Sequence, residues 1–526
     1  MRGADGLSHL SGRQSAWAFA LGCAAVTAGV LMHAPMYLMG RDMHFRLAGM
    51  AMGPDMVFGM VLIVGGLMLA GWGLLPKDIA AQRVASEGLV VAAPEDAQLG
   101  RAHWILMIVL VLALIIDVMK PAALGFALPE LSREYGVSKP VASLLPFFAL
   151  VGTVAGSVIW GFLADIYGRK ATILLSAVMF VGTAVCGAMP SFAWNVFMCF
   201  LMGAAAGGML PVTYALLAEM MPTRHRGWSL VLVGGLGAVG GYFAASGASA
   251  LLQPAYSWRV LFLLNLPTGI MLVFLGALSP ESAKFLLAHG RRAEAAAVMR
   301  KFGSVARKTA RPADPRKASQ PALGSHSAAK LAALSIAALS WGLINFGLLL
   351  WLPGDLQEKG YSIAVSGRLL AQSALIAFPT VFLCAFIYSR WSSKWSLVTM
   401  LGITLFGLLL LLRLELAGHG SPVLPVAMLI VGSNGILAIL LPYTAESFPL
   451  RVRGRATGWV AACTKGGGVG AQALSIAALV PPAAIVAKAM LAPVLLALVL
   501  VSWFGRETRG GDLRRLDEWD SAAAEP

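Results

Sequence analysis

Charged residues are scarce in this chain of 526 residues: only 12% are Asp, Glu, Lys or Arg, whereas 58% are hydrophobic. A water-soluble domain is about 45–50% apolar and about 25% charged. This scarcity excludes an ordinary soluble protein. Apolar runs of about 20 residues recur along the chain without alternating ten-residue strands, so we expect an all-α integral membrane protein and not a β-barrel.

Cysteine is equally rare, and the sequences that mark several enzyme classes are missing. The five cysteines stand singly in apolar stretches without CxxC spacing, which excludes a disulfide framework and a cysteine metal site. The chain has no Walker loop, no HExxH and no GxSxG in a strand-turn-helix context, which argues against an ATPase and a membrane-embedded hydrolase. We therefore predict neither enzymatic activity nor a cofactor.

Acidic residues are outnumbered by basic ones, 25 to 40, but the excess does not form a nucleic-acid-binding face. The basic residues lie in short segments between apolar runs, such as Arg169–Lys170 and Arg451–Arg455, and loops such as 190–192 have almost none. Lys and Arg are retained on the cytoplasmic side of a membrane. The pattern predicts a multi-pass protein of the cell inner membrane with both termini in the cytoplasm.

Hydropathy predicts about fourteen spans, the first of which lacks a convincing signal cleavage site and is taken as a true span. The expected spans are 16–38, 52–75, 104–128, 141–163, 171–189, 194–217, 228–252, 260–278, 331–352, 368–388, 396–414, 423–443, 457–480 and 483–504. They divide the chain into a two-helix extension with its linker (1–103), a six-helix bundle (104–278), a cytoplasmic linker (279–330), a second six-helix bundle (331–504) and a tail (505–526). The basic linker is either a solvated loop that serves topology alone, which we favour, or a segment that rests on anionic lipid with an amphipathic helix over residues 281–302.

An internal repeat relates the two bundles. Ala218-Glu219-x-x-Pro222-x-Arg224-x-Arg226-Gly227 returns 227 residues later as Ala445-Glu446-x-x-Pro449-x-Arg451-x-Arg453-Gly454. The same offset places the span 104–128 on 331–355, the first span after the linker. Parallel repeats of this kind build transporters with a solute site at the repeat interface. The repeated Glu and Arg residues predict charge pairs that latch neighbouring helix ends as a gate.

Further motifs occur in a fixed order around this repeat. They include Gly161-Phe-Leu-Ala-Asp165-Ile-Tyr-Gly168-Arg169-Lys170, Trp258-Arg259, Pro280-Glu281-Ser282 and Glu507-Thr508-Arg509-Gly510. With these motifs the chain resembles the major facilitator superfamily, especially its sugar-porter and metabolite:H+ symporter branches, over about residues 104–513. The resemblance implies two six-helix bundles that rock about a central site, a small-molecule substrate, protons as the coupling ion and a monomeric carrier. It also implies that Asp165 and Arg169 stabilise the outward-facing state.

Two features depart from that family pattern. The repeat offset sets Asp165 against Ser392, and the loop from Tyr388 to Lys394 has lost the acidic residue and the glycine. We therefore expect an asymmetric gate in which the second half contributes less. The two spans before residue 100 are not needed by a twelve-helix core. They contain Met and His residues at helical spacing, which could form a copper(I) site, but we expect a docking or lid role without metal.

Ionisable residues at membrane depth are the candidates for transport chemistry, because their burial is costly unless they are paired or hydrated, and that cost needs a reason. Asp117 and Lys120 lie three residues apart on the first core helix. They can satisfy each other as an ion pair, or Asp117 can carry the coupling proton while Lys120 attracts an anionic substrate. Lys465 lies in a glycine-rich span and can hold an anion or pair with Asp117 or Glu446. Asn345, Gln372 and Asn434 can donate hydrogen bonds to substrate or between helices.

The sequence thus predicts a secondary transporter that moves a small organic metabolite, expected to be anionic, together with protons by alternating access. An efflux carrier for amphipathic compounds, an importer of a neutral or copper-linked solute, and a non-transporting membrane sensor on a carrier scaffold remain open at this point. The predicted gate comprises Gly161, Asp165, Gly168, Arg169, Lys170, Glu219, Arg224, Arg226, Glu446, Arg451 and Arg453.

Overall fold

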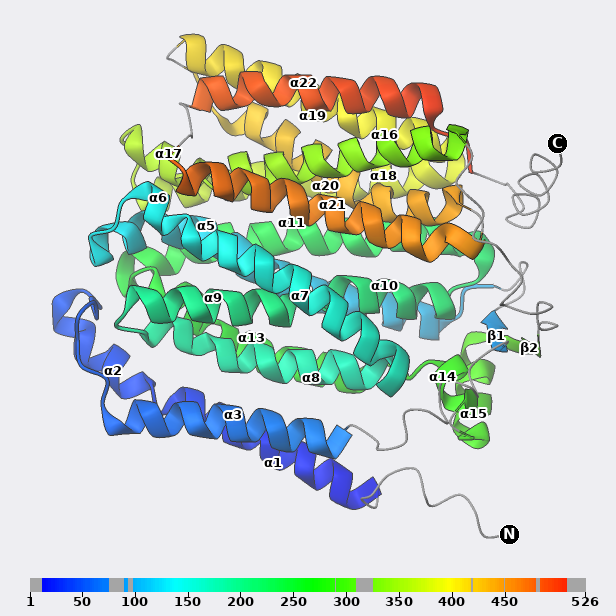
Figure 1. Ribbon diagram of the computed structural model, residues 1–526, viewed down its shortest axis with the longest axis horizontal. Coiled ribbons are helices and arrows are strands. Elements are labelled where there is room, and N and C mark those ends of the chain that lie inside the picture. Colours follow the sequence, from blue (N-terminus) through cyan, green and yellow to red (C-terminus); the bar gives the residue numbers. More distant parts are fainter. Residues whose placement is uncertain are drawn as a thin grey trace.

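The computed structural model of the protein describes residues 12–74, 89–92, 98–288, 290–308, 325–417, 420–448, 450–478 and 483–508. Long helices run side by side through this part of the chain (Figure 1). Thirteen of the described helical segments are long and apolar enough to cross a membrane. The predicted all-α membrane fold is confirmed.

The first bundle is built from residues 101–278. Its elements are α5 (Arg101–Tyr135), α6 (Lys139–Ala142), α7 (Leu144–Tyr167), α8 (Arg169–Gly182), η2 (Thr183–Ala188), α9 (Phe192–Ala206), α10 (Met209–Met220), α11 (Thr223–Tyr256), α12 (Arg259–Leu263) and α13 (Asn265–Leu278). Helices α9 and α10 together make one span, as do α12 and α13. Small residues let these helices approach closely: a side chain at Gly203 would collide with the backbone of Ala149 on α7.

The second bundle repeats this plan. Its elements are α16 (Ser325–Leu343), η3 (Ile344–Leu349), α17 (Leu352–Glu358), α18 (Ile363–Arg390), α19 (Ser393–Ala417), α20 (Val423–Ser447), α21 (Leu450–Ile476) and α22 (Ala483–Phe504). Helix α21 crosses the bundle like its neighbours, although its polar sequence keeps it out of the thirteen apolar spans. The π-helix η3 interrupts the first span of this bundle, and such interruptions often lie at functional sites.

The two bundles together have two distinguishable ends, of which we call the one with the basic linker the basic end (Figure 1). At the basic end, the linker helices α14 (Ala283–Ala288) and α15 (Arg292–Phe302) lie beside the strand pair β1 (Leu89–Ala92) and β2 (Val305–Lys308). This antiparallel pair joins the linker before the core to the linker between the bundles and was not predicted. We call the opposite end, where α2 (Ala34–Met39), α6 and α17 lie, the distal end.

The N-terminal extension forms a separate helix pair on the outside of the first bundle, on the side away from the second bundle (Figure 1). It comprises α1 (Gly12–Leu31), α2 (Ala34–Met39), η1 (Gly40–Met43) and α3 (Pro54–Leu74). Helices α1 and α3 touch through glycines: a side chain at Gly29 would meet the carbonyl oxygen of Gly59. Val26 and Ile63 then pack on α8 near Gly182. The two extra predicted spans are therefore present and pack against the outside of the first bundle.

Candidate functional site

A cavity of about 420 Å³ lies between the two bundles. Elements of both bundles line it, namely α5, α7, α9, α10 and α11 from the first and α16, η3, α17, α20 and α21 from the second. Its wall is mostly apolar, and Asp117 and Lys465 are the two charged residues among the described residues that line it. The cavity thus presents one carboxyl group and one ammonium group, each from a different bundle.

Asp117 lies on α5 at the point where proline interrupts the helix. Pro121 has no N–H, so the carbonyl of Asp117 loses its usual helical partner and α5 can bend beside the cavity. The side chain is 5% exposed, and its Oδ1 has no hydrogen-bond partner in the described structure. An ionised carboxylate in such a place is costly, and taking up a proton removes that cost.

Lys465 faces the cavity from α21, beside two aromatic rings that pack on each other. Its Nζ lies 5.8 Å from the ring centroid of Trp341 and 5.5 Å from that of Phe346. It attracts the Asp117 carboxylate electrostatically, but no ion pair within 4.0 Å joins these two described residues. The ammonium is therefore held at the cavity wall without a directly bonded counter-ion.

Lys120 takes a different direction from Asp117. Its Nζ donates to Thr183 Oγ1 at 2.8 Å and to the carbonyl of Phe180 at 3.3 Å, and it lies 2.7 Å from the Phe180 ring centroid. The side chain is 1% exposed and does not line the cavity. Asp117 and Lys120 do not form a direct ion pair among the described contacts. In this conformation Lys120 joins α5 to α8 and η2 and is turned away from solute.

The predicted amide contacts divide in the same way. Asn345 on η3 and Asn434 on α20 line the cavity, whereas Gln372 on α18 is exposed on the outer surface. Sequence reasoning missed Trp341 and Tyr242, whose Nε1 and hydroxyl are buried at the cavity wall without a partner in the described structure. An aromatic residue within an apolar span carries no signal that separates a cavity wall from lipid-facing surface.

Contacts between the bundles close the cavity at the distal end. Arg133 on α5 donates to Gln357 on α17 at 2.9 Å, and Ser143 hydrogen-bonds with Ser475 on α21. Eight residues before Arg133 on α5, a side chain at Gly125 would collide with the carbonyl of Leu350 of the second bundle. The cavity lining begins at this closure and continues toward the basic end.

The predicted gate of the first half is assembled at the basic end. Arg169 pairs with Glu219 at 3.0 Å, and its backbone N–H donates to Glu281 Oε1 at 2.9 Å. Gly168 has φ of +97°, and a side chain there would collide with the Glu281 carboxylate. Burial raises the pKa of Glu281, while the backbone N–H groups of Ser282, Arg169 and Lys170 favour its charged form.

Other predicted gate residues of this half are more peripheral. Lys170 donates from Nζ to the carbonyl of Ala277 at 2.7 Å. Arg224 is exposed, Arg226 is half-buried, and Gly161 faces open space. The side chains of Asp165, Arg451 and Arg453 lie outside the described part of the structure.

In the second half, a carboxylate from the chain's tail bonds to the loop that lacks the acidic residue. Glu507 Oε1 accepts hydrogen bonds from the backbone N–H of Ser393 at 2.9 Å and from its hydroxyl at 2.6 Å. Thr508 donates to Glu446, which also accepts from Tyr388 at 2.7 Å. A carboxylate therefore caps the third helix in each half, Glu281 on α8 and Glu507 on α19. The two halves use different residues, but each has a polar latch.

Comparisons with known proteins agree with this architecture. The family model described as Major Facilitator Superfamily matches residues 104–472. The niacin transporter NiaP of Acinetobacter baylyi is 24% identical over 396 residues, which cover 73% of this chain and 88% of that protein. The 4-hydroxybenzoate transporter PcaK of Pseudomonas putida is 35% identical over 206 residues, or 37% of this chain and 43% of that one.

Solved structures show the same fold. The proton:xylose symporter XylE bound to 6-bromo-6-deoxy-D-glucose matches with a TM-score of 0.63 and 16% identity, covering 79% of this chain and 98% of that one. The inward-open form of XylE from E. coli matches with a TM-score of 0.62. Together with the family model and the two six-helix bundles, these matches show that the chain is a multi-pass membrane transporter of the Major Facilitator Superfamily.

Proposed function

We propose that this protein carries a small aromatic monocarboxylate across the cell inner membrane together with protons. The observation that carries the proposal is the Lys465 ammonium, which lies in a mostly apolar cavity without a directly bonded counter-ion and faces a buried carboxyl group across the bundle interface. An apolar wall with a few convergent polar groups is typical of a small-molecule site.

The cavity chemistry matches an anion with an apolar body. A carboxylate can pair with Lys465, while the flanking rings of Trp341 and Phe346 offer surface to a planar ring. Asn345 and Asn434 supply the amide groups that orient a polar substituent. Niacin, 4-hydroxybenzoate and benzoate, which the names of similar transporters contain, are all aromatic monocarboxylates and support this substrate class.

Proton coupling follows from the two charges. While the cavity is empty, Lys120 and Lys465 both offset the negative charge of Asp117, although neither bonds to it directly. A bound substrate carboxylate competes for the Lys465 ammonium, so the buried charge of Asp117 is then less well compensated and Asp117 takes up a proton. Substrate and proton thereby load together, and the cavity becomes nearly neutral before the bundles rock about it. Import with both termini in the cytoplasm is the proposed orientation.

The experiment is uptake of a radiolabelled aromatic monocarboxylate into proteoliposomes under an imposed pH gradient. Asp117→Asn keeps the shape of the side chain but cannot exchange a proton, so we expect it to abolish gradient-driven accumulation while exchange between internal and external substrate continues. Asp355→Asn on α17 is the matched control, because Asp355 pairs with Lys359 outside the cavity. Accumulation by Asp117→Asn at the control rate would remove Asp117 as the coupling site.

A further inference from the structure

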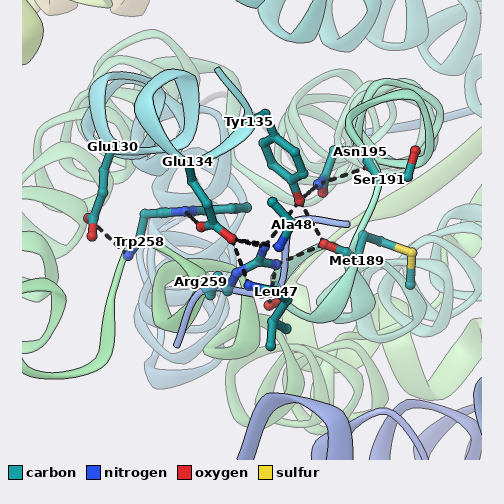
Figure 2. A network of polar contacts seen from close by, with 11 residues as sticks. Leu47, Ala48, Glu130, Glu134, Tyr135, Met189, Ser191, Asn195, Trp258 and Arg259 are labelled. Carbon is teal, nitrogen blue, oxygen red and sulfur yellow. Dashed lines mark hydrogen bonds and ion pairs between the residues drawn. The ribbon is translucent and has the colours of Figure 1, made fainter. Parts of the chain in front are cut away.

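A loop of the N-terminal extension docks on the distal end of the first bundle. We call residues 44–50, between η1 and α3, the clamp loop. The backbone N–H groups of Leu47 and Ala48 donate to Glu134 Oε1 at 2.8 and 3.1 Å (Figure 2). Glu134 is on α5, so a segment outside the family match bonds directly to the first core helix.

Glu134 is the centre of a buried polar network. Its Oε1 pairs with Arg259 Nη2 at 2.6 Å, and its Oε2 accepts from Trp258 Nε1 at 2.7 Å. The side chains of Arg259 and Glu134 are 0% and 4% exposed. Arg259 also donates to the carbonyl of Met189 at 2.8 Å and to the Tyr135 hydroxyl at 3.1 Å (Figure 2). The network therefore joins the ends of α5 and α12 to the segment between η2 and α9.

The clamp loop is fixed in place by its own aromatic contacts. Phe45 is 9% exposed, stacks on Tyr37 with ring centroids 4.7 Å apart, and packs on Tyr256 at the end of α11. The Tyr37 hydroxyl donates to the carbonyl of Tyr256 at 2.8 Å. His44 and Phe45 both have positive φ, at 54° and 58°. Residues with side chains this large rarely adopt that conformation, so the surrounding contacts must stabilise it.

The same end of α5 forms the distal closure on its opposite side. Arg133, next to Glu134 in sequence, reaches across to Gln357 of the second bundle. Pro129, one turn earlier, faces Gly354 of α17. Neighbouring residues of one helix end therefore serve two purposes: Glu134 holds the extension and the first bundle, and Arg133 meets the second bundle.

We infer that the clamp loop is a positioning element of the distal closure. By bonding Glu134, the loop holds the end of α5 where Arg133 and Pro129 meet the second bundle. The extension thus takes part in the transport cycle without touching solute. The clamp loop acts on the closure alone, so its role is the same for any substrate and does not depend on an aromatic carboxylate.

The test measures the distal closure in the full chain. In a background with the native cysteines replaced, Ser143→Cys and Ser475→Cys place two thiols at an existing contact between the bundles. The rate of disulfide formation with a thiol oxidant then reports how often this end is closed. We expect Phe45→Ala to lower that rate about fivefold, which corresponds to a shift of the closed population within the usual range for coupled sites.

Phe58→Ala is the matched control, because Phe58 is on α3 of the same extension and is 55% exposed on its outer face. This control removes a side chain of the same type at a position outside the clamp loop, so it should leave the rate of disulfide formation unchanged. A purely structural role would lower the yield of folded Phe45→Ala protein but not its crosslinking rate. Equal rates for folded Phe45→Ala and Phe58→Ala would overturn the inference.

A milder variant keeps the test decisive if Phe45→Ala does not fold. Tyr37→Phe deletes the hydrogen bond to Tyr256 and keeps the stacked ring. We expect a smaller decrease in crosslinking rate in the same direction. If Phe45→Ala does not fold, Tyr37→Phe alone decides the test, and a crosslinking rate equal to that of Phe58→Ala overturns the inference.

Discussion

Replacing Lys465 by Met should remove the charge contact on which anion recognition depends while keeping a side chain of similar length. Two charges 4 Å apart interact by about 4 kcal/mol at an effective dielectric of 20. Desolvation offsets part of this, and a hydrogen bond to a charged group contributes about 1.5–3 kcal/mol net. We therefore expect Lys465→Met to weaken binding of a carboxylate about 10- to 150-fold.

The assay is a pair of binding titrations on purified protein, with benzoate and its neutral analogue benzamide. The variant should lose affinity for benzoate while its affinity for benzamide changes little, because benzamide cannot use the ammonium's charge. Lys488→Gln is the control, since Lys488 on α22 is exposed and does not line the cavity. Equal losses for both ligands, or no loss for benzoate, would refute Lys465 as the anion contact.

Two further predictions concern residues outside the cavity wall. Gly168→Ala should lower the free energy of unfolding by about 1–3 kcal/mol, because the new side chain meets Glu281 at a positive φ, and this is measured as a lower melting temperature in detergent. Gly161→Ala is the control and should not lower the melting temperature, because Gly161 faces open space. Equal melting temperatures for the two variants would contradict this prediction. Lys120→Met should reduce thermal stability yet leave carboxylate affinity within about twofold, because the ammonium bonds Thr183 and does not face the cavity; a tenfold weaker titration would place Lys120 in the site.

Much of the fold was predictable because it repeats. The matched Glu219 and Glu446 motifs located the two bundles, and apolar length alone located the extension helices α1 and α3. The strand pair β1 and β2 was missed because each strand has only four residues, too few for a periodic signal. Short segments of this kind are determined by contacts between distant parts of the chain.

Within the site, the sequence predicted which polar residues lie at membrane depth but not the direction in which their side chains point. Asp117 and Lys120 are three residues apart, so their sequence spacing suggested a shared face, yet Asp117 lines the cavity and Lys120 bonds to Thr183 on η2. The rotation of α5, its prolines and the length of the Lys side chain separate the two groups. Gln372 likewise lies at membrane depth but faces outward.

The sequence also could not predict which residue bonds to a recognised motif. Trp258-Arg259 was part of the family resemblance, but Glu134, which accepts from both side chains, is 125 residues away from Arg259. Likewise, Ser392 replaced the expected acidic residue, and the carboxylate that caps the helix there comes from Glu507 in the tail. Such pairings need a three-dimensional structure because no local pattern links their members.

The most direct test of proton-coupled carboxylate transport is proton flux driven by substrate alone. Proteoliposomes that contain a trapped pH indicator start at equal pH inside and outside, and an inward gradient of an aromatic monocarboxylate is then applied. We expect acidification of the interior with wild-type protein, and none above the empty-liposome rate with Asp117→Asn. Uptake of radiolabelled substrate by the wild type without acidification would contradict it.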